Sequence, residues 1–403
     1  MTTDVFAPFI GTQTQLHANS NAWRKTDFRT VPVSLLTSEI TKAAEAEISS
    51  WEEYRQSPLI ELPGLAKALG LAEIYYKDES ERFGLGSFKA LGGAYAVLRV
   101  LTQFLAAQGI EVSSGSSLRE GQYQALTSKL TVTTATDGNH GRSVAWGARM
   151  FGCRCVVYIH AEVSQGREQA LLAQGAQVVR IEGSYDDSVH RCSEDAEKND
   201  WTIVSDTSWG NYREIPREIM AGYSVMVSEV IEQLKRQPPT HVFVQGGVGG
   251  VASTIADLFA QTWSENRPRF VVVEPELAAC LFASAQAGRA TAVRVEEETL
   301  MAGLSCGEVS VLAWEVLGGA ADDFMTIAED VVAPTMKLLV DAPFGDTSII
   351  AGESAVAGLA AVLAAGLRPV LSKKLGLDSQ SRILVIGTEG ATDPDIYLKL
   401  TGR

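Results

Sequence analysis

The chain has 403 residues, of which 46% are hydrophobic and 21% are charged, and its formal net charge at pH 7 is −15. This length exceeds what one compact core supports, so it predicts two domains. The negative charge argues against a nucleic-acid partner, because nothing in the composition would neutralise phosphates along a strand. The composition is that of an ordinary soluble globular protein.

The sequence also argues against export and membrane insertion. Its start lacks the basic, apolar and small-residue order of a signal peptide. The longest apolar run, 355–367, is shorter than the ~20 residues that a membrane span needs, and it predicts a buried helix. The five cysteines form no spaced metal set, and reduced thiols explain them best. We expect a cytoplasmic protein with no bound metal.

Strands and helices alternate through most of the chain. In chain order we expect helix 37–51, helix 64–69, strand 74–77, helix 88–107, strand 130–134, helix 141–151, strand 154–160, helix 165–173, strand 177–181, strand 201–206, helix 222–235, and strands 241–245, 270–274 and 382–387. Residues 1–57 otherwise look irregular, and 109–121 predicts a surface insertion. The strands are short, β-branched and unbroken, which indicates parallel sheets buried on both faces. The pattern predicts an α/β fold with two sheets and with ligands at the carboxyl ends of strands.

One lysine lies in an unusually apolar setting. Segment 81–93 reads Glu-Arg-Phe-Gly-Leu-Gly-Ser-Phe-Lys-Ala-Leu-Gly-Gly, and it places Lys89 directly after Phe88 and just before a Gly-Gly pair. Such a setting predicts a desolvated amine, whose pKa is lowered as Schiff-base chemistry requires. A lysine at the edge of a buried helix that extends its ammonium group into solvent would give the same pattern.

Segment 245–251 (Gln-Gly-Gly-Val-Gly-Gly-Val) follows an expected strand and opens a helix. Its four glycines allow successive backbone N–H groups to converge on an anion, and the helix N-terminus adds its positive end. The spacing is neither that of a P-loop nor that of a dinucleotide fingerprint, so ATP and NAD are disfavoured. A monophosphate is the economical ligand beside a buried lysine, and a glycine turn without a ligand is the alternative.

Two further turns carry polar side chains after strands. In segment 136–141, Asn139 is placed to present a side-chain donor, although turn chemistry alone would also explain it. The neighbouring His140 is of a type that is more often structural than catalytic. At the end of the last strand, Thr388 is placed to point a hydroxyl group at a heterocycle.

The lysine, the asparagine turn, the glycine loop and the terminal hydroxyl, in this order, resemble the fold-type II pyridoxal-phosphate enzymes, the tryptophan synthase β-like family. The resemblance implies two open, twisted, mostly parallel sheets flanked by helices, with the cofactor in a cleft between domains. It implies that Lys89 holds pyridoxal 5′-phosphate as an internal aldimine next to Phe88, that Asn139 contacts the 3-hydroxyl group, and that Thr388 meets the pyridine nitrogen. The backbone amides implied to hold the phosphate are those of Gly246, Gly247, Val248, Gly249 and Gly250.

Two details of this resemblance bear on the reaction. A neutral hydroxyl at the pyridine nitrogen does not keep that nitrogen protonated, which favours prompt loss of a β-leaving group over transamination. Val248 leaves fewer glycines in the phosphate loop than some relatives have.

Within this family the closest likeness is to the diaminopropionate ammonia-lyases, and it extends over most of the chain. The matching segments are Lys77–Leu85, Thr136–Arg142, Asp206–Trp209, Met301–Glu308 and Gly352–Ser354. The likeness implies a homodimer that acts on an amino-acid substrate. It would convert 2,3-diaminopropionate and water to pyruvate and two ammonia by α,β-elimination, through the Lys89 aldimine and an aminoacrylate.

Two carboxylates are implied to handle the substrate's charge. Asp137 stands where dehydratases of this fold carry a small or hydroxylic residue, and a carboxylate there would bind the β-ammonium group or act as a base opposite Lys89. Asp206 follows a strand and would share this role, or it would only cap the following turn.

Other expectations stay open at this stage. A serine or threonine dehydratase of the same fold is the alternative function, and a non-catalytic amino-acid-binding relative is a third reading. We expect a smaller domain at 89–209, inserted into a larger one made of 1–88 and 210–403. Cys280 and Cys306 are expected to come close together, although a disulfide would be unusual in the cytoplasm.

Overall fold

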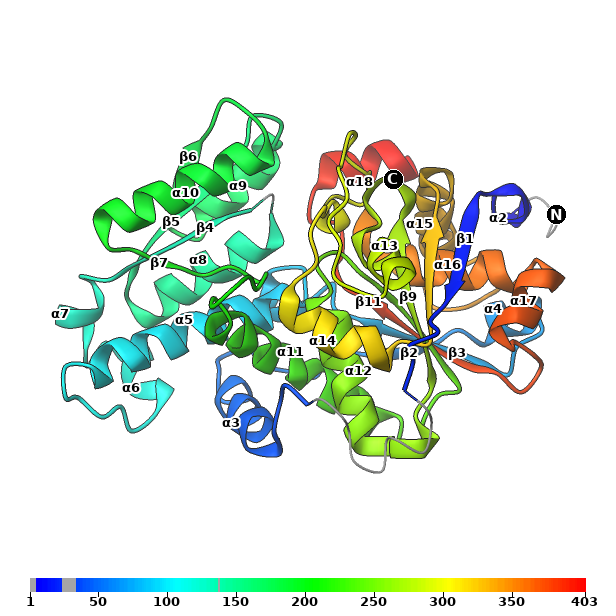
Figure 1. Ribbon diagram of the computed structural model, residues 1–403, viewed down its shortest axis with the longest axis horizontal. Helices are drawn as coiled ribbons and strands as arrows, with labels where there is room; N and C mark the ends of the chain where they lie inside the picture. The colour runs from blue at the N-terminus through cyan, green and yellow to red at the C-terminus, as the bar shows by residue number, and fades with distance from the viewer. Residues whose placement is uncertain (1–4, 24–33, 137) are drawn as a thin grey trace. The chain divides into compact units, whose positions relative to one another are not determined.

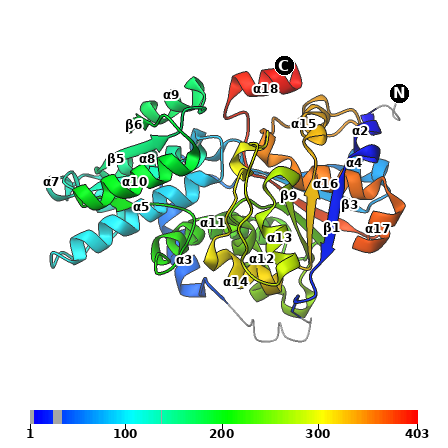
Figure 2. The same cartoon turned by 45° about the horizontal axis from the view of Figure 1, so that its top comes forward.

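The computed structural model describes residues 5–23, 34–136 and 138–403. The chain divides into two compact units (Figures 1 and 2). The first unit comprises Met1–Leu35, Gln56–Glu81 and Met226–Arg403, and the second comprises Leu36–Arg55 and Arg82–Val225.

The first unit is built on a seven-stranded sheet with the order β1-β10-β9-β8-β11-β3-β2. Its strands are β1 (Thr14–Ala18), β2 (Leu59–Glu61), β3 (Glu73–Asp78), β8 (His241–Gln245), β9 (Arg269–Pro275), β10 (Asp323–Ile327) and β11 (Arg382–Gly387). The edge strands β1 and β2 run antiparallel to their neighbours, and all the inner pairs are parallel. This arrangement confirms the predicted mostly parallel sheet, whereas β1 and β10 were not expected from the sequence.

The helices of the first unit include one that is wholly apolar. They are α2 (Ala7–Gly11), α4 (Pro63–Leu69), α12 (Gly250–Trp263), α13 (Cys280–Ala287), α14 (Val311–Ala320), α15 (Val332–Asp341), α16 (Ala357–Gly366), α17 (Pro369–Leu375) and α18 (Pro394–Thr401), with 3₁₀ turns at Ser264–Asn266, Glu276–Ala278, Ala302–Leu304, Glu329–Val331 and Glu353–Ala355. In α16 every residue from Ala357 to Ala365 is buried, as its apolar sequence predicts. Among the described residues, no helix is long and apolar enough to span a membrane.

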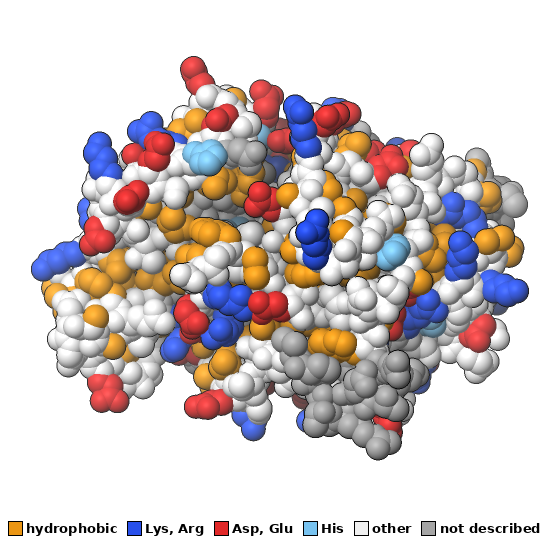
Figure 3. All heavy atoms as spheres, viewed as in Figure 1, with side chains coloured by type: hydrophobic (Ala, Val, Ile, Leu, Met, Phe, Trp, Pro, Cys, Tyr) orange, Lys and Arg blue, Asp and Glu red, His pale blue; other side chains and the backbone are white. Residues whose placement is uncertain are grey.

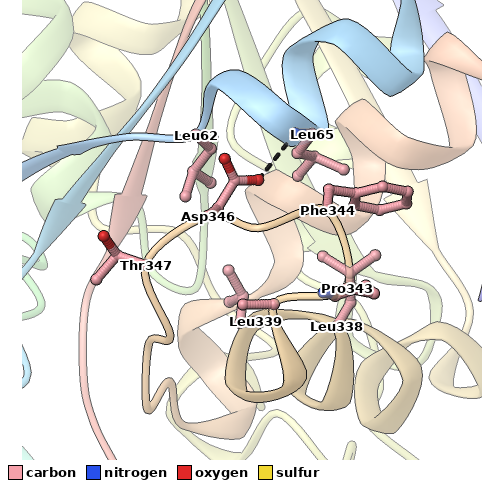
Figure 4. Close-up of a pocket in the computed structure, with 9 residues that line it drawn as sticks. Leu62, Leu65, Leu338, Leu339, Pro343, Phe344, Asp346 and Thr347 are labelled. Atoms are coloured by element: carbon pink, nitrogen blue, oxygen red, sulfur yellow. Dashed lines mark hydrogen bonds between the residues drawn. The ribbon is translucent and has the colours of Figure 1, made fainter.

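Helix α4 shows how a distant side chain begins a helix that has no cap of its own. Its N-cap residue, Leu62, offers no side-chain oxygen to the first turn. The carboxylate of Asp346 accepts hydrogen bonds from the backbone N–H groups of Gly64 (2.7 Å) and Leu65 (2.8 Å) instead, beside a small apolar pocket (Figure 4). A negative charge at a helix N-terminus is favourable, so Asp346 stabilises α4 against the rest of its unit.

The second unit contains a four-stranded parallel sheet with the order β6-β5-β4-β7. The strands are β4 (Thr131–Ala135), β5 (Arg154–Ile159), β6 (Gln177–Arg180) and β7 (Thr202–Ile203); the helices are α3 (Ser38–Ile48), α5 (Lys89–Ala106), α6 (Gly115–Arg119), α7 (Gln124–Thr127), α8 (Asn139–Phe151), α9 (Gln165–Ala173), α10 (Tyr185–Asn199) and α11 (Glu214–Gln233), which ends in the first unit, with a 3₁₀ turn at Arg82–Gly84. Helices cover both faces of this sheet: Val156 and Tyr158 pack against Cys192 of α10, and Val157 lies next to Gly141 of α8.

Two expectations about this unit need correction. The segment 109–121 is not a plain surface insertion, because it contains α6, where Leu118 is buried and Arg119 pairs with Glu47. The expected domain 89–209 lies inside the second unit, but the unit also takes in 36–55, 82–88 and 210–225. An aromatic cluster explains the first addition, since the ring of Trp51 packs against those of Phe83, Trp146 and Phe151.

Helices α5 and α8 approach each other more closely than ordinary side chains permit. A Cβ atom on Gly93 would lie 2.5 Å from Ser143 Oγ, and one on Gly147 would lie 2.6 Å from the Cα of Ala94. The Ser143 hydroxyl also accepts a hydrogen bond from the backbone N–H of Ala94 (3.0 Å). Both helices begin next to Asp206, since its carboxylate pairs with Lys89 and lies 4.0 Å from Nδ1 of His140. Because α5 and α8 also pack together, they run parallel, and their N-termini lie at the same end of the pair.

We expect Gly147→Ala to destabilise the protein by about 1–3 kcal/mol, because the added methyl group must push the α5 backbone away. Gly366→Ala is the matched control, since a Cβ there would make an ordinary 3.5 Å contact with Leu69 Cδ2. The control should be neutral or slightly stabilising, as alanine favours a helix. Urea unfolding followed by circular dichroism measures both, and equal effects would show that the close approach is not a constraint.

Candidate active site

Lys89 is the first residue of α5, and its ammonium group forms an ion pair with the carboxylate of Asp206. The two side chains are only 22% and 19% exposed, so the amine does not reach freely into solvent as the alternative reading required. The Lys89 Nζ atom also lies 5.6 Å from the centre of the Phe88 ring, which in turn packs at 4.7 Å against Tyr223. The structure thus places the predicted lysine in a partly desolvated, aromatic-lined position.

Asp206 is held in its ionised form. Burial alone would raise its pKa, but the nearby charge of Lys89 outweighs burial and holds the pKa of Asp206 below its usual value. Asp206 follows the short strand β7, which agrees with the rule that functional groups gather at the carboxyl ends of parallel strands. The carboxylate that pairs with Lys89 is therefore charged at neutral pH.

His140, the second residue of α8, fixes the backbone next to this pair. Its Nε2 atom lies 2.8 Å from the carbonyl oxygen of Val204, and since a carbonyl only accepts, Nε2 must carry the proton. Burial lowers the pKa of His140, so the ring is neutral at pH 7. Its Nδ1 atom lies 4.0 Å from an oxygen of Asp206. His140 thus ties α8 to the chain between β7 and Asp206, a structural role of the kind expected from the sequence.

Asn139 begins α8, at the end of the helix pair where Lys89 begins α5. This juxtaposition follows from the parallel packing of the two helices. Gly141, in the first turn of α8, packs closely against Thr136, since a Cβ there would lie 2.4 Å from the Thr136 side chain. Asp137, the predicted partner for the substrate's amine, lies outside the described residues.

The glycine loop of the first unit runs from the end of β8 to the start of α12. The N–H group of Gly246 donates to the carbonyl of Val273 (2.8 Å), which extends the sheet by one residue, so this amide is committed to the sheet rather than to an anion. The sequence predicted that five amides hold a phosphate, but the Gly246 amide is not free to do so. The amides that remain for this role are those of Gly247–Gly250. Gly249 caps α12 with a left-handed φ of 96°, which favours glycine. The remaining amides lie at a helix N-terminus, where anions bind favourably.

Side chains from other segments pack closely against Gly246 and Gly247 of the loop. A Cβ on Gly246 would lie 2.6 Å from Leu281 Cδ1, and one on Gly247 would lie 3.1 Å from Cys306 Sγ. Cys280, the first residue of α13, lies against the same loop, and its thiol donates to the carbonyl oxygen of Gly247 at 3.6 Å. Cys280 and Cys306 are therefore neighbours of one glycine, as expected, and both are free thiols.

Thr388 follows β11 and is 4% exposed. Its hydroxyl oxygen accepts a hydrogen bond from Nε2 of Gln245, the last residue of β8, at 2.7 Å. The structure thus links the predicted hydroxyl to the residue immediately before the glycine loop.

The sequence analysis assigned no role to three residues that lie next to the predicted site residues. Tyr223 contacts Phe88, and Gln245 contacts Thr388, only because distant segments pack together. No local sequence pattern indicates either contact. Glu274 is buried behind the loop, where it accepts hydrogen bonds from the N–H groups of Leu281 and Phe282, and burial raises the pKa of Glu274 to about 8. Its position at the end of an apolar strand, just before a proline, was the one available signal.

The chain is similar to known proteins in both sequence and structure. A family model described as pyridoxal-phosphate dependent enzyme matches residues 51–389. Diaminopropionate ammonia-lyase of Escherichia coli strain K12 is 39% identical over 350 residues, covering 85% of this chain and 86% of the relative. The Salmonella typhimurium protein of the same name is 36% identical over 374 residues, covering 91% and 92%. A crystal structure of the holo form of the Escherichia coli enzyme matches with a TM-score of 0.88 at 34% identity, over 97% of both chains.

Proposed function

The chain belongs to the pyridoxal-phosphate dependent enzymes, and from that premise we propose that it is a lyase that converts 2,3-diaminopropionate and water to pyruvate and two ammonia. The observation that carries the proposal is the partly buried ion pair of Lys89 and Asp206. It occurs in a chain that is 36–39% identical to two diaminopropionate ammonia-lyases over most of its length.

The residues present fit the cofactor. A side chain on Gly246 or Gly247 would collide with the residues that pack behind the loop, and the amides that follow lie at the start of α12. We assign the aldehyde carbon to Lys89, with Phe88 beside it, the 3-hydroxyl group to Asn139, the phosphate to the amides of Gly247, Val248, Gly249 and Gly250, and the pyridine nitrogen to Thr388. When bound, pyridoxal phosphate supplies an electron sink for the electron pair left on the substrate's α-carbon after proton removal.

The charged side chains handle the protons and the leaving group. Lys89 is the base for the α-proton of the L-isomer, and Asp137 is the base for the D-isomer, which presents its α-hydrogen on the opposite face. The substrate's β-amine leaves readily only as an ammonium, because it then departs as neutral ammonia. Asp206 and Asp137 bind that ammonium through charge-assisted hydrogen bonds and so keep it protonated.

We further propose that the enzyme works as a homodimer in the cytoplasm. All five cysteines are free, which suits a reducing compartment. Acidic and basic side chains are mixed over the face shown in Figure 3, which suits a small-molecule enzyme better than a nucleic-acid-binding protein. Closed two-fold dimers are the commonest assembly of soluble enzymes, and light scattering would measure the mass directly.

The function is tested by pyruvate release from D- and L-diaminopropionate and from D- and L-serine. We expect both isomers of diaminopropionate to react faster than serine, because a hydroxyl leaving group gains nothing from a carboxylate that binds an ammonium. Faster release from serine or threonine would identify the chain as a dehydratase instead. A protein that binds these amino acids without releasing pyruvate would be the non-catalytic relative.

We expect Asp137→Asn to lower kcat/KM for the D-isomer by several orders of magnitude, because the base on that face is lost. Part of the activity on the L-isomer should remain, since Lys89 is intact. Steady-state kinetics with each enantiomer separates the two roles of Asp137. Equal losses for both isomers would mean that Asp137 only binds the leaving amine.

Asp200→Asn is the matched control for this experiment. Asp200 is an exposed aspartate in the left-handed conformation at the end of α10, where asparagine is equally well tolerated. The control makes the same chemical change away from the site, and both values of kcat/KM should stay unchanged.

A further inference from the structure

The side chain of Gln245 has a fixed orientation at the end of β8. It is 1% exposed, and its Nε2 atom lies 2.8 Å from the carbonyl oxygen of Ile386 and 2.7 Å from Thr388 Oγ1. A third carbonyl oxygen, that of Ala355, lies at 3.5 Å. Backbone carbonyls only accept hydrogen bonds, so the atom that faces them must be the amide nitrogen. Gln245 therefore presents an N–H group, and not an oxygen, to Thr388.

This orientation limits what the Thr388 hydroxyl can do. The hydroxyl group has one proton and two lone pairs, and one lone pair accepts from Gln245. Across residues 5–23, 34–136 and 138–403, no other hydrogen bond of the Thr388 side chain is found, and the residue is 4% exposed. The hydroxyl proton thus remains available to a ligand.

The two ends of the Gln245 amide have different surroundings. Its Oε1 atom is buried and has no hydrogen-bond partner among the described residues, which costs free energy. Gly358 of α16 leaves room for that oxygen, since a Cβ there would lie 3.4 Å from it and 2.7 Å from the carbonyl oxygen of Phe243. The hydrogen bonds of the Gln245 amide to the described residues are therefore all made by its nitrogen, to Ile386 and Thr388 above all.

We propose that Gln245 is a positioning residue that makes Thr388 a hydrogen-bond donor to the pyridine nitrogen and thereby keeps that nitrogen unprotonated. The proposal rests on the proposed function, because it requires pyridoxal phosphate with its nitrogen against Thr388. A protonated ring nitrogen would need a hydrogen-bond acceptor. The Thr388 hydroxyl could accept from it only if the hydroxyl's own proton were donated to another group. Gln245 offers none. An unprotonated ring withdraws less charge, which favours loss of the β-group over transamination.

The test compares the apoenzyme's affinity for pyridoxal 5′-phosphate with that for 1-deazapyridoxal 5′-phosphate, in which a C–H group replaces the ring nitrogen. The wild-type protein should prefer the natural cofactor about tenfold, the value of one net hydrogen bond of about 1.4 kcal/mol. Thr388→Val should abolish the preference, and Gln245→Met should reduce it to about the same level. The double variant should lose no more than either single one.

Gln124→Met is the control, since Gln124 is exposed on α7 in the other unit and should keep the full preference. Full preference in Gln245→Met, or none in the wild type, would overturn the proposal. Failure of the wild-type apoenzyme to bind pyridoxal phosphate at all would instead overturn the proposed function.

A second measurement needs no variant and so does not depend on whether Gln245→Met folds. Nitrogen-15 NMR of the holoenzyme, with the cofactor labelled at the ring nitrogen, reports the protonation state directly. The proposal requires a shift typical of an unprotonated, hydrogen-bonded pyridine, and a pyridinium shift overturns it.

Discussion

The close contact between α5 and α8 is the constraint on which the second unit's part of the site depends. Gly93 and Gly147 remove the side chains that would hold the two backbones apart, and Ser143 uses the space for a hydrogen bond across the pair. Because the helices are parallel, this contact also sets the relative positions of their first residues, Lys89 and Asn139. The residues expected to meet the cofactor's aldehyde and its 3-hydroxyl group are thus placed by packing several residues away.

The two units contribute different kinds of chemistry. The second unit supplies charge, in the ion pair of Lys89 and Asp206, while burial keeps the adjacent His140 neutral. The first unit supplies neutral dipoles, from the amides of Gly247–Gly250 and from the Thr388 hydroxyl. The proposed elimination would need both kinds of group, with charged side chains to move protons and an ammonium and neutral dipoles to hold the cofactor.

Much of this organisation could be predicted from the sequence, because local patterns specify it. Glycines beside Lys89 and after β8 mark positions where backbones approach closely, and the unbroken apolar run in α16 marks a buried helix. The missed features depend on contacts between distant segments. The edge strand β1 pairs with β10 across some three hundred residues, and Gln245 meets Thr388 only after β8 and β11 pair. The sequence of one segment does not show which distant residue it will contact. For the same reason, it does not show that the Gly246 N–H group bonds to the neighbouring strand.

The central claim is that Lys89 carries the cofactor, and one measurement tests it most directly. Reduction of the holoenzyme with borohydride, followed by peptide mapping, should find the pyridoxyl group on Lys89. Lys77 is the informative competitor, since it is fully buried but donates to Glu229, to the carbonyl of Ser57 and to Gln233. Those bonds commit its amine to the structure of the first unit. A pyridoxyl group on Lys77 would contradict the account.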